Sequence, residues 1–163
     1  MTKNTFQHIS GYSAKKELAL WQAGIFTWDE FQIRHTSQLS FFNTGSANDI
    51  IVESIQAFAN GDADFFAKRR SPSEYYRIAL AFPRDVLFLD IETTGLSRYY
   101  DHITLIGWSF LDKFGVYYPG MDKAHLIEAF NRAKCIVTFN GSIFDLPFIK
   151  KNSQSYRFRS AIR

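Results

Sequence analysis

Hydrophobic residues recur at helical spacing in the first half of the chain. Leu18, Trp21 and Ile25 lie three or four residues apart, which places them on one face of a helix. A longer amphipathic pattern runs from about residue 48 to residue 59. This periodicity predicts a small helical region over residues 1–81.

Two segments of this region have the composition of helix N-termini. Thr27 and Glu30 have the spacing of a capping box, in which each side chain binds the other residue's backbone N–H. Ser71, Pro72 and Glu74 predict a second capping box, with proline at the first helical position.

The pattern changes after residue 81 to short apolar runs separated by turns. The first and last runs are apolar on both faces, which predicts neighbouring, covered strands in the middle of a sheet. The short turn between the second and third runs predicts an antiparallel hairpin. We therefore expect an α/β fold over residues 82–163, with a mixed sheet of about four strands and flanking helices. The expected strands are 85–90, 103–110, 115–118 and 135–139, and the expected helices are 121–132 and one that begins near residue 143.

Composition and charge limit the classes of protein to which the chain can belong. The chain has 163 residues, of which 46% are hydrophobic, and a net charge of +3, so it has enough apolar surface for a core and permits a polyanionic partner. Its single cysteine, Cys135, lies in an apolar run and is expected to be a buried thiol. No apolar run approaches the roughly 20 residues of a membrane span. We expect a cytoplasmic protein without membrane contact.

Three carboxylates stand next to the expected central strands. Asp90 and Glu92 end the first strand, where residues two apart face the same side, and Asp145 follows the fourth strand in the first turn of a helix. If the two strands are neighbours, Asp145 lies beside Asp90. Three oxygen ligands without His or Cys favour Mg²⁺ or Mn²⁺. Singly, each carboxylate also fits a structural role as a strand end, a solvated side chain or a helix cap.

Two motifs carry a family resemblance. Residues 90–95, DIETTG, resemble the first motif of the DEDD 3′–5′ exonucleases of the ribonuclease H-like superfamily. Residues 139–148, FNGSIFDLPF, are similar to their second motif, as it occurs in the proofreading domains of family-B DNA polymerases and in a bacterial group of predicted exonucleases.

The resemblance implies a role for each matching residue. Asp90, Glu92 and Asp145 would be catalytic and would hold two metal ions, and Thr94, Gly95 and Asn140 would bind the substrate. That substrate would be DNA or RNA with a single-stranded 3′ end. Thr94 and Gly95 equally fit a plain turn, and Asn140 equally fits an Asn-Gly turn.

The third motif of that family, which carries a fourth carboxylate, is missing. No acidic residue follows Asp145. The chain is therefore expected to be a C-terminally truncated copy of the domain, with impaired 3′–5′ exonuclease activity. The alternatives are a catalytically inactive nucleic-acid-binding module and a truncated gene product without activity.

The N-terminal segment 8–13, His-Ile-Ser-Gly-Tyr-Ser, resembles the hairpin half of a helix-hairpin-helix element. Its loop amides would bind a DNA phosphate in such an element. A structural helix cap is the favoured alternative for this segment.

Overall fold

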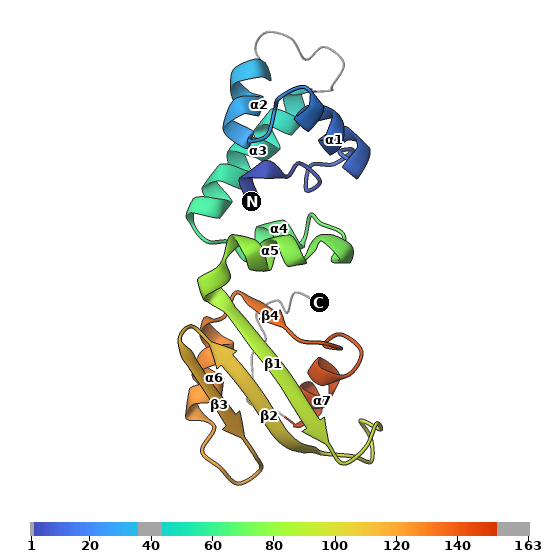
Figure 1. Ribbon diagram of the computed structural model, residues 1–163, viewed down its shortest axis with the longest axis vertical. Coiled ribbons are helices and arrows are strands. Elements are labelled where there is room, and N and C mark those ends of the chain that lie inside the picture. Colours follow the sequence, from blue (N-terminus) through green and yellow to red (C-terminus); the bar gives the residue numbers. More distant parts are fainter. Residues whose placement is uncertain (1, 36–43, 153–163) are drawn as a thin grey trace. The chain divides into compact units, whose positions relative to one another are not determined.

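The chain is divided into two compact units. The computed structural model describes residues 2–35 and 44–152, and the units are Met1–Ala81 and Phe82–Arg163. The first unit is helical, and the second contains the sheet (Figure 1). No helix in these described stretches combines the length and the apolar character that crossing a bilayer requires.

The first unit is built from short helices and one longer helix. In chain order they are η1 (Thr2–Asn4), α1 (Ala14–Gln22), α2 (Trp28–His35), α3 (Thr44–Ala59), α4 (Ala63–Ala67), η2 (Pro72–Glu74) and α5 (Tyr76–Ala81).

The capping box at the start of α2 is confirmed. The Glu30 carboxylate accepts a hydrogen bond from the Thr27 backbone N–H at 2.9 Å, and the Thr27 hydroxyl accepts one from the Glu30 N–H at 3.2 Å. The predicted second box is wrong, because the Ser71 side chain makes no capping hydrogen bond and the Glu74 carboxylate pairs with Arg77 instead. Pro72 nevertheless opens a short 3-10 turn, as expected.

Segment 8–13, the hairpin-like start, packs through His8 into the core of the first unit. His8 is buried, and its Nε2 lies 2.8 Å from the Ser54 hydroxyl of α3. Burial, together with the positive charges of Arg70 and Arg69, lowers the pKa of His8 to about 3. The imidazole is therefore neutral at physiological pH, and this first residue of the segment is part of the core.

A buried carboxylate ties the N-terminal segment to α1 and α5. The Glu17 carboxylate accepts hydrogen bonds from the Phe6 backbone N–H and the Gln7 side chain, both at 2.7 Å, and pairs with Arg77 at 3.2 Å. Burial by itself raises the pKa of Glu17. The hydrogen bonds from Gln7, Phe6 and Thr5 and the charge of Arg77 outweigh it, so the net pKa lies below its usual value of 4.5.

We expect Glu17→Gln to lower the free energy of unfolding by about 1–3 kcal/mol at neutral pH, because it removes a buried charged acceptor. Since the folded-state pKa is lowered, this stabilisation is present above the unfolded-state pKa and is lost as the pH falls through the folded-state pKa. Urea unfolding followed by tryptophan fluorescence should therefore show a difference between the two proteins that shrinks on acidification. Glu53→Gln, at an exposed ion pair with Arg69, is the matched control and should have little effect. A pH-independent difference for Glu17→Gln would contradict the prediction.

The second unit contains a four-stranded mixed sheet in the order β3-β2-β1-β4. β1 pairs antiparallel with β2 and parallel with β4, and β2 pairs antiparallel with β3. The predicted hairpin and the predicted adjacency of the first and fourth strands are confirmed. The strands are β1 (Val86–Thr93), β2 (Ile103–Phe110), β3 (Lys113–Tyr117) and β4 (Cys135–Val137).

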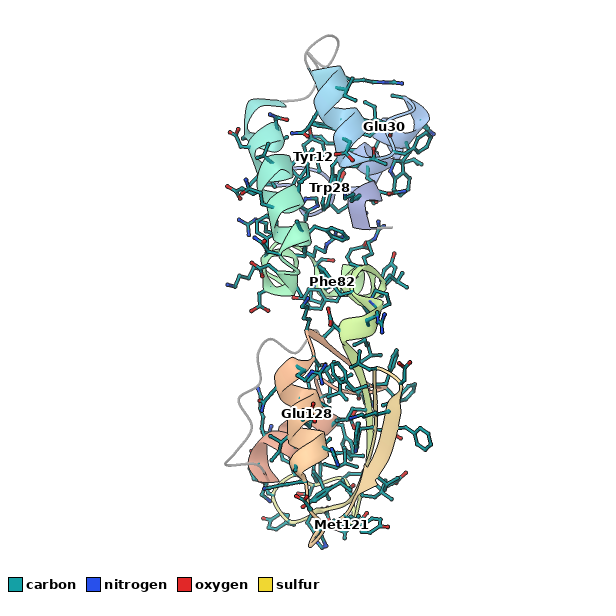
Figure 2. The ribbon with its side chains drawn as sticks, turned by 90° about the vertical axis from the view of Figure 1, so that its left-hand side faces the viewer. Tyr12, Trp28, Glu30, Phe82, Met121 and Glu128 are labelled. Atoms are coloured by element: carbon teal, nitrogen blue, oxygen red, sulfur yellow. The ribbon has the colours of Figure 1, made fainter. Side chains whose placement is uncertain are left out.

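Helices α6 (Ala124–Arg132) and α7 (Asp145–Asn152) cover one face of this sheet. A short 3-10 turn, η3 (Pro83–Asp85), precedes β1. Helices α6 and α7 lie on the same side of the sheet (Figure 2). Leu126 of α6 and Phe148 of α7 share one core with inward residues of the strands such as Leu87. Cys135 is fully buried, as expected.

The expectation that β1 is covered on both faces is wrong. Leu87, Leu89 and Ile91 are buried, but Phe88 between them is 54% exposed. The reason is that both described helices of this unit pack on one face. Apolar side chains on the other face of β1 are left open to solvent.

Candidate nuclease site

Asp90 and Glu92 lie on the open face of β1. The burial of β1 alternates, so Phe88, Asp90 and Glu92 are exposed on one side while the residues between them are buried. Asp90 stands opposite Gly107 of β2, and the register of the two strands shifts just after Glu92. The strand therefore presents both carboxylates on the same side, close to its carboxyl end.

Asp145 is the first residue of α7 and is only 3% exposed. Its carboxylate accepts a hydrogen bond from the Thr138 hydroxyl and another from the Asn140 backbone N–H. Both donors belong to the segment that leads from β4 into α7. Because β4 is parallel to β1, this segment leaves the sheet at the same edge as the end of β1.

The structure brings Asp145 within electrostatic reach of Asp90. Burial raises the pKa of Asp145, the hydrogen bond from Asn140 opposes this, and the negative charge of Asp90 raises the pKa further. Two carboxylates that interact in this way have an unfavourable mutual repulsion when both are ionised. A cation between them would relieve it.

The oxygen donors of this site suit a hard divalent cation such as Mg²⁺ or Mn²⁺. Across residues 2–35 and 44–152, however, no group of three or more His, Cys, Asp or Glu side chains is assembled closely enough to hold a metal ion. The convergence of Asp90, Glu92 and Asp145 on one ion therefore stays a prediction. The third motif was predicted to be missing from the residues after Asp145. Of these residues, 153–163 lie outside the described part of the chain.

Asn140 and Gly141 form the turn that positions Asp145. The Asn140 carbonyl accepts hydrogen bonds from the backbone N–H groups of Ile143 and Phe144, at 3.1 and 2.8 Å. A side chain at Gly141 would collide with the Thr138 methyl group, so only glycine fits there. The close approach of these two residues keeps the Thr138 hydroxyl on the Asp145 carboxylate.

We expect Gly141→Ala to destabilise the second unit by about 1–3 kcal/mol, because the added methyl group overpacks a buried turn. Gly107→Ala is the matched control, since a methyl group at Gly107 meets no atom within 4 Å. Thermal unfolding of the two variants beside the wild type measures the difference. Equal melting temperatures for Gly141→Ala and Gly107→Ala would contradict the steric argument.

Thr94 and Gly95 belong to a loop closed by Asp101. The Thr94 hydroxyl donates a hydrogen bond to the Asp101 carboxylate at 3.0 Å and accepts one from the His102 backbone N–H at 3.2 Å. A side chain at Gly95 would lie 2.6 Å from the Asp101 carboxylate. Thr94 and Gly95 therefore both contribute to the conformation of this loop. Their role in substrate binding stays a prediction.

Two contributors to the site were missed in the sequence. Thr138 is the hydroxyl donor to Asp145, and its only signal is that it is a polar residue inside an apolar run. Asp101 shapes the loop after Glu92 through hydrogen bonds to Thr94 and to the Ser97 backbone N–H at 2.9 Å. No spacing in the sequence links Asp101 to the carboxylates of β1.

Of the comparisons with known proteins, one gives a match, and it covers most of the second unit. Searches of curated proteins and of solved structures returned no match. A family model described as the RNase H superfamily matches residues 87–163, which include the strands and the carboxylates described above. The four-stranded mixed sheet with its helices is consistent with an RNase H-like fold, and residues 87–163 are thus similar to the RNase H superfamily.

Proposed function

We propose that the second unit is a metal-dependent 3′–5′ exonuclease-like domain that hydrolyses phosphodiester bonds of nucleic acid. Its similarity to the RNase H superfamily indicates nuclease-like activity, nucleic-acid binding and use of divalent metals. The observation that carries the proposal is the buried Asp145 carboxylate at the end of the sheet where β1 and the β4–α7 segment meet, with a pKa that burial and the charge of Asp90 raise.

In this proposal Asp90, Glu92 and Asp145 hold Mg²⁺ or Mn²⁺. Divalent ions at such sites activate water and stabilise the charge that develops on a phosphodiester. Thr138 and the Asn140 backbone hold the Asp145 carboxylate in a fixed orientation through their hydrogen bonds. Thr94, Gly95 and Asn140 are the proposed contacts of the terminal nucleotide.

A binding module without hydrolysis is the second candidate. It is favoured by the absence, from the described residues, of an assembled group of three metal ligands. Its binding to single-stranded nucleic acid would persist in EDTA and weaken steeply with salt, because phosphate contacts release counterions.

The two candidates are separated by incubating the full chain with Mn²⁺ and single-stranded DNA or RNA labelled at the 5′ end. A ladder of products shortened one nucleotide at a time from the 3′ end is the expected result. Internal cuts would replace the exonuclease proposal with an endonuclease. Binding without any cleavage would support the inactive module.

A further inference from the structure

A shallow groove crosses the open face of the sheet and runs up to Asp90. Its volume is about 710 Å³. Phe88 and Asp90 of β1 lie along it, and Gly107 of β2 stands opposite Asp90 in the strand register. A methyl group at Gly107 would meet no atom within 4 Å, so there is open space above this part of the sheet.

Two exposed aromatic rings line this groove. Phe88 is 54% exposed and Phe139 is 96% exposed. Phe88 pairs with Val137, the last residue of β4, and Phe139 follows two residues later in the segment that leads toward α7. Both rings therefore lie along the same groove, one on β1 and the other just beyond β4.

Exposed aromatic rings act as stacking platforms for the flat bases of single-stranded nucleic acid. Successive nucleotides of one strand are about 3.4 Å apart when their bases are stacked. Phe88 also lies two residues before Asp90 on the same face, or roughly 6.6 Å along the strand. A base held at Phe88 would therefore be within about two stacked nucleotides of the carboxylates.

We propose that Phe139 and Phe88 bind a base of single-stranded nucleic acid by stacking, and so determine which part of the strand reaches Asp90. The proposal deepens the function proposed above and rests on it for the identity of the ligand. Aromatic stacking accepts any base, so these residues would select single-stranded over base-paired substrate without reading its sequence.

The position of the two rings favours a nucleic acid over a protein partner. The groove includes Asp90, one of the proposed catalytic carboxylates, and also has polar lining from Ser109 and Thr138. Phe114 of β3 is 87% exposed and pairs with Ser109, which places it on the same face, but it does not line the groove. Phe114 therefore provides a matched control, because a protein or a second copy seated on the whole face would contact it as well.

The test measures binding of the full chain to a fluorescein-labelled single-stranded oligonucleotide in EDTA, so that no hydrolysis occurs. The comparison ligand has the same backbone with abasic sites in place of the bases. Phe139→Ala should weaken binding of the normal oligonucleotide by about 5- to 150-fold, the range expected for one stacked base. It should leave binding of the abasic strand within about 2-fold, and Phe114→Ala should change neither. Because Phe139 is almost fully exposed, its replacement leaves the core intact.

Several results would overturn the inference. They are no binding by the wild type, an equal effect of Phe139→Ala on both ligands, and an effect of Phe114→Ala as large as that of Phe139→Ala. If light scattering shows a dimer, and Phe139→Ala dissociates it, the open face of the sheet would instead bind a second copy of the chain.

The outcome is separable from that of the proposed function. Hydrolysis without base-dependent binding would remove only the stacking proposal. Base-dependent binding by a chain that shows no hydrolysis would overturn only the proposed enzymatic activity.

Discussion

Asp90→Asn should reduce phosphodiester hydrolysis in Mn²⁺ by at least about 100-fold. Loss of residues that merely orient metal ligands already costs about 10- to 100-fold, and Asp90 is proposed to bind the ion itself. The substitution keeps the shape of the side chain and removes its charge. Initial rates on a labelled single-stranded oligonucleotide, at equal protein concentrations, measure the loss.

Asp112→Asn is the control for Asp90→Asn. Asp112 is an exposed carboxylate in the turn between β2 and β3, outside the groove beside Asp90. We expect it to retain wild-type activity. Because Asp90 is exposed and its charge repels Asp145, Asp90→Asn should melt at or above the wild-type temperature when no metal is present. Equal rates for wild type and Asp90→Asn would show that any measured hydrolysis comes from elsewhere.

Trp28→Ala should lower the stability of the first unit by about 3–5 kcal/mol, the usual cost of removing a buried aromatic side chain. Trp28 is fully buried between the helices (Figure 2). Its ring stacks on Phe66 with the centroids 5.9 Å apart, and the His8 ring lies 5.3 Å away. Its indole N–H also donates a hydrogen bond to the Thr5 carbonyl at 2.8 Å. Urea unfolding followed by far-UV circular dichroism measures the effect.

Two further substitutions separate the causes of this loss. Trp28→Phe keeps most of the ring and loses the hydrogen bond to Thr5, so it should cost less than Trp28→Ala. Ile33→Ala is made on the same helix at a side chain that is 74% exposed and should be nearly neutral. If Trp28→Ala and Ile33→Ala had equal effects, the stability of the first unit would not depend on the packing of Trp28 against Phe66 and His8.

The common face of Asp90 and Glu92 was predictable because strand periodicity fixes which side a residue faces. Asp90 and Glu92 are two residues apart in a strand, and the structure presents both on one face. The two most apolar strands were expected to be neighbours, and β1 and β4 pair in parallel. That adjacency places the segment that leads into Asp145 at the same end of the sheet as Asp90.

The open face of the sheet was not predictable in the same way. The pattern around Phe88 shows that the strand is apolar on both sides, but it carries no information about whether another element packs there. The hydrogen bond from Thr138 to Asp145 depends on the tight turn at Gly141, which only the three-dimensional contact between residues 138 and 141 reveals. Likewise, Ser71 and Glu74 have the spacing of a capping box, yet Glu74 pairs with Arg77, which binds Glu17 as well.

The most direct test of the account is a thermal melt of the wild type, Asp90→Asn and Asp145→Asn with increasing Mn²⁺. An ion that binds only the folded chain stabilises it by about 2.7 kcal/mol at 100 times its dissociation constant. We predict that Mn²⁺ raises the melting temperature of the wild type, that EDTA reverses the rise, and that both variants lose most of it. The same rise in all three proteins, or none in the wild type, would contradict a shared cation site between Asp90 and Asp145.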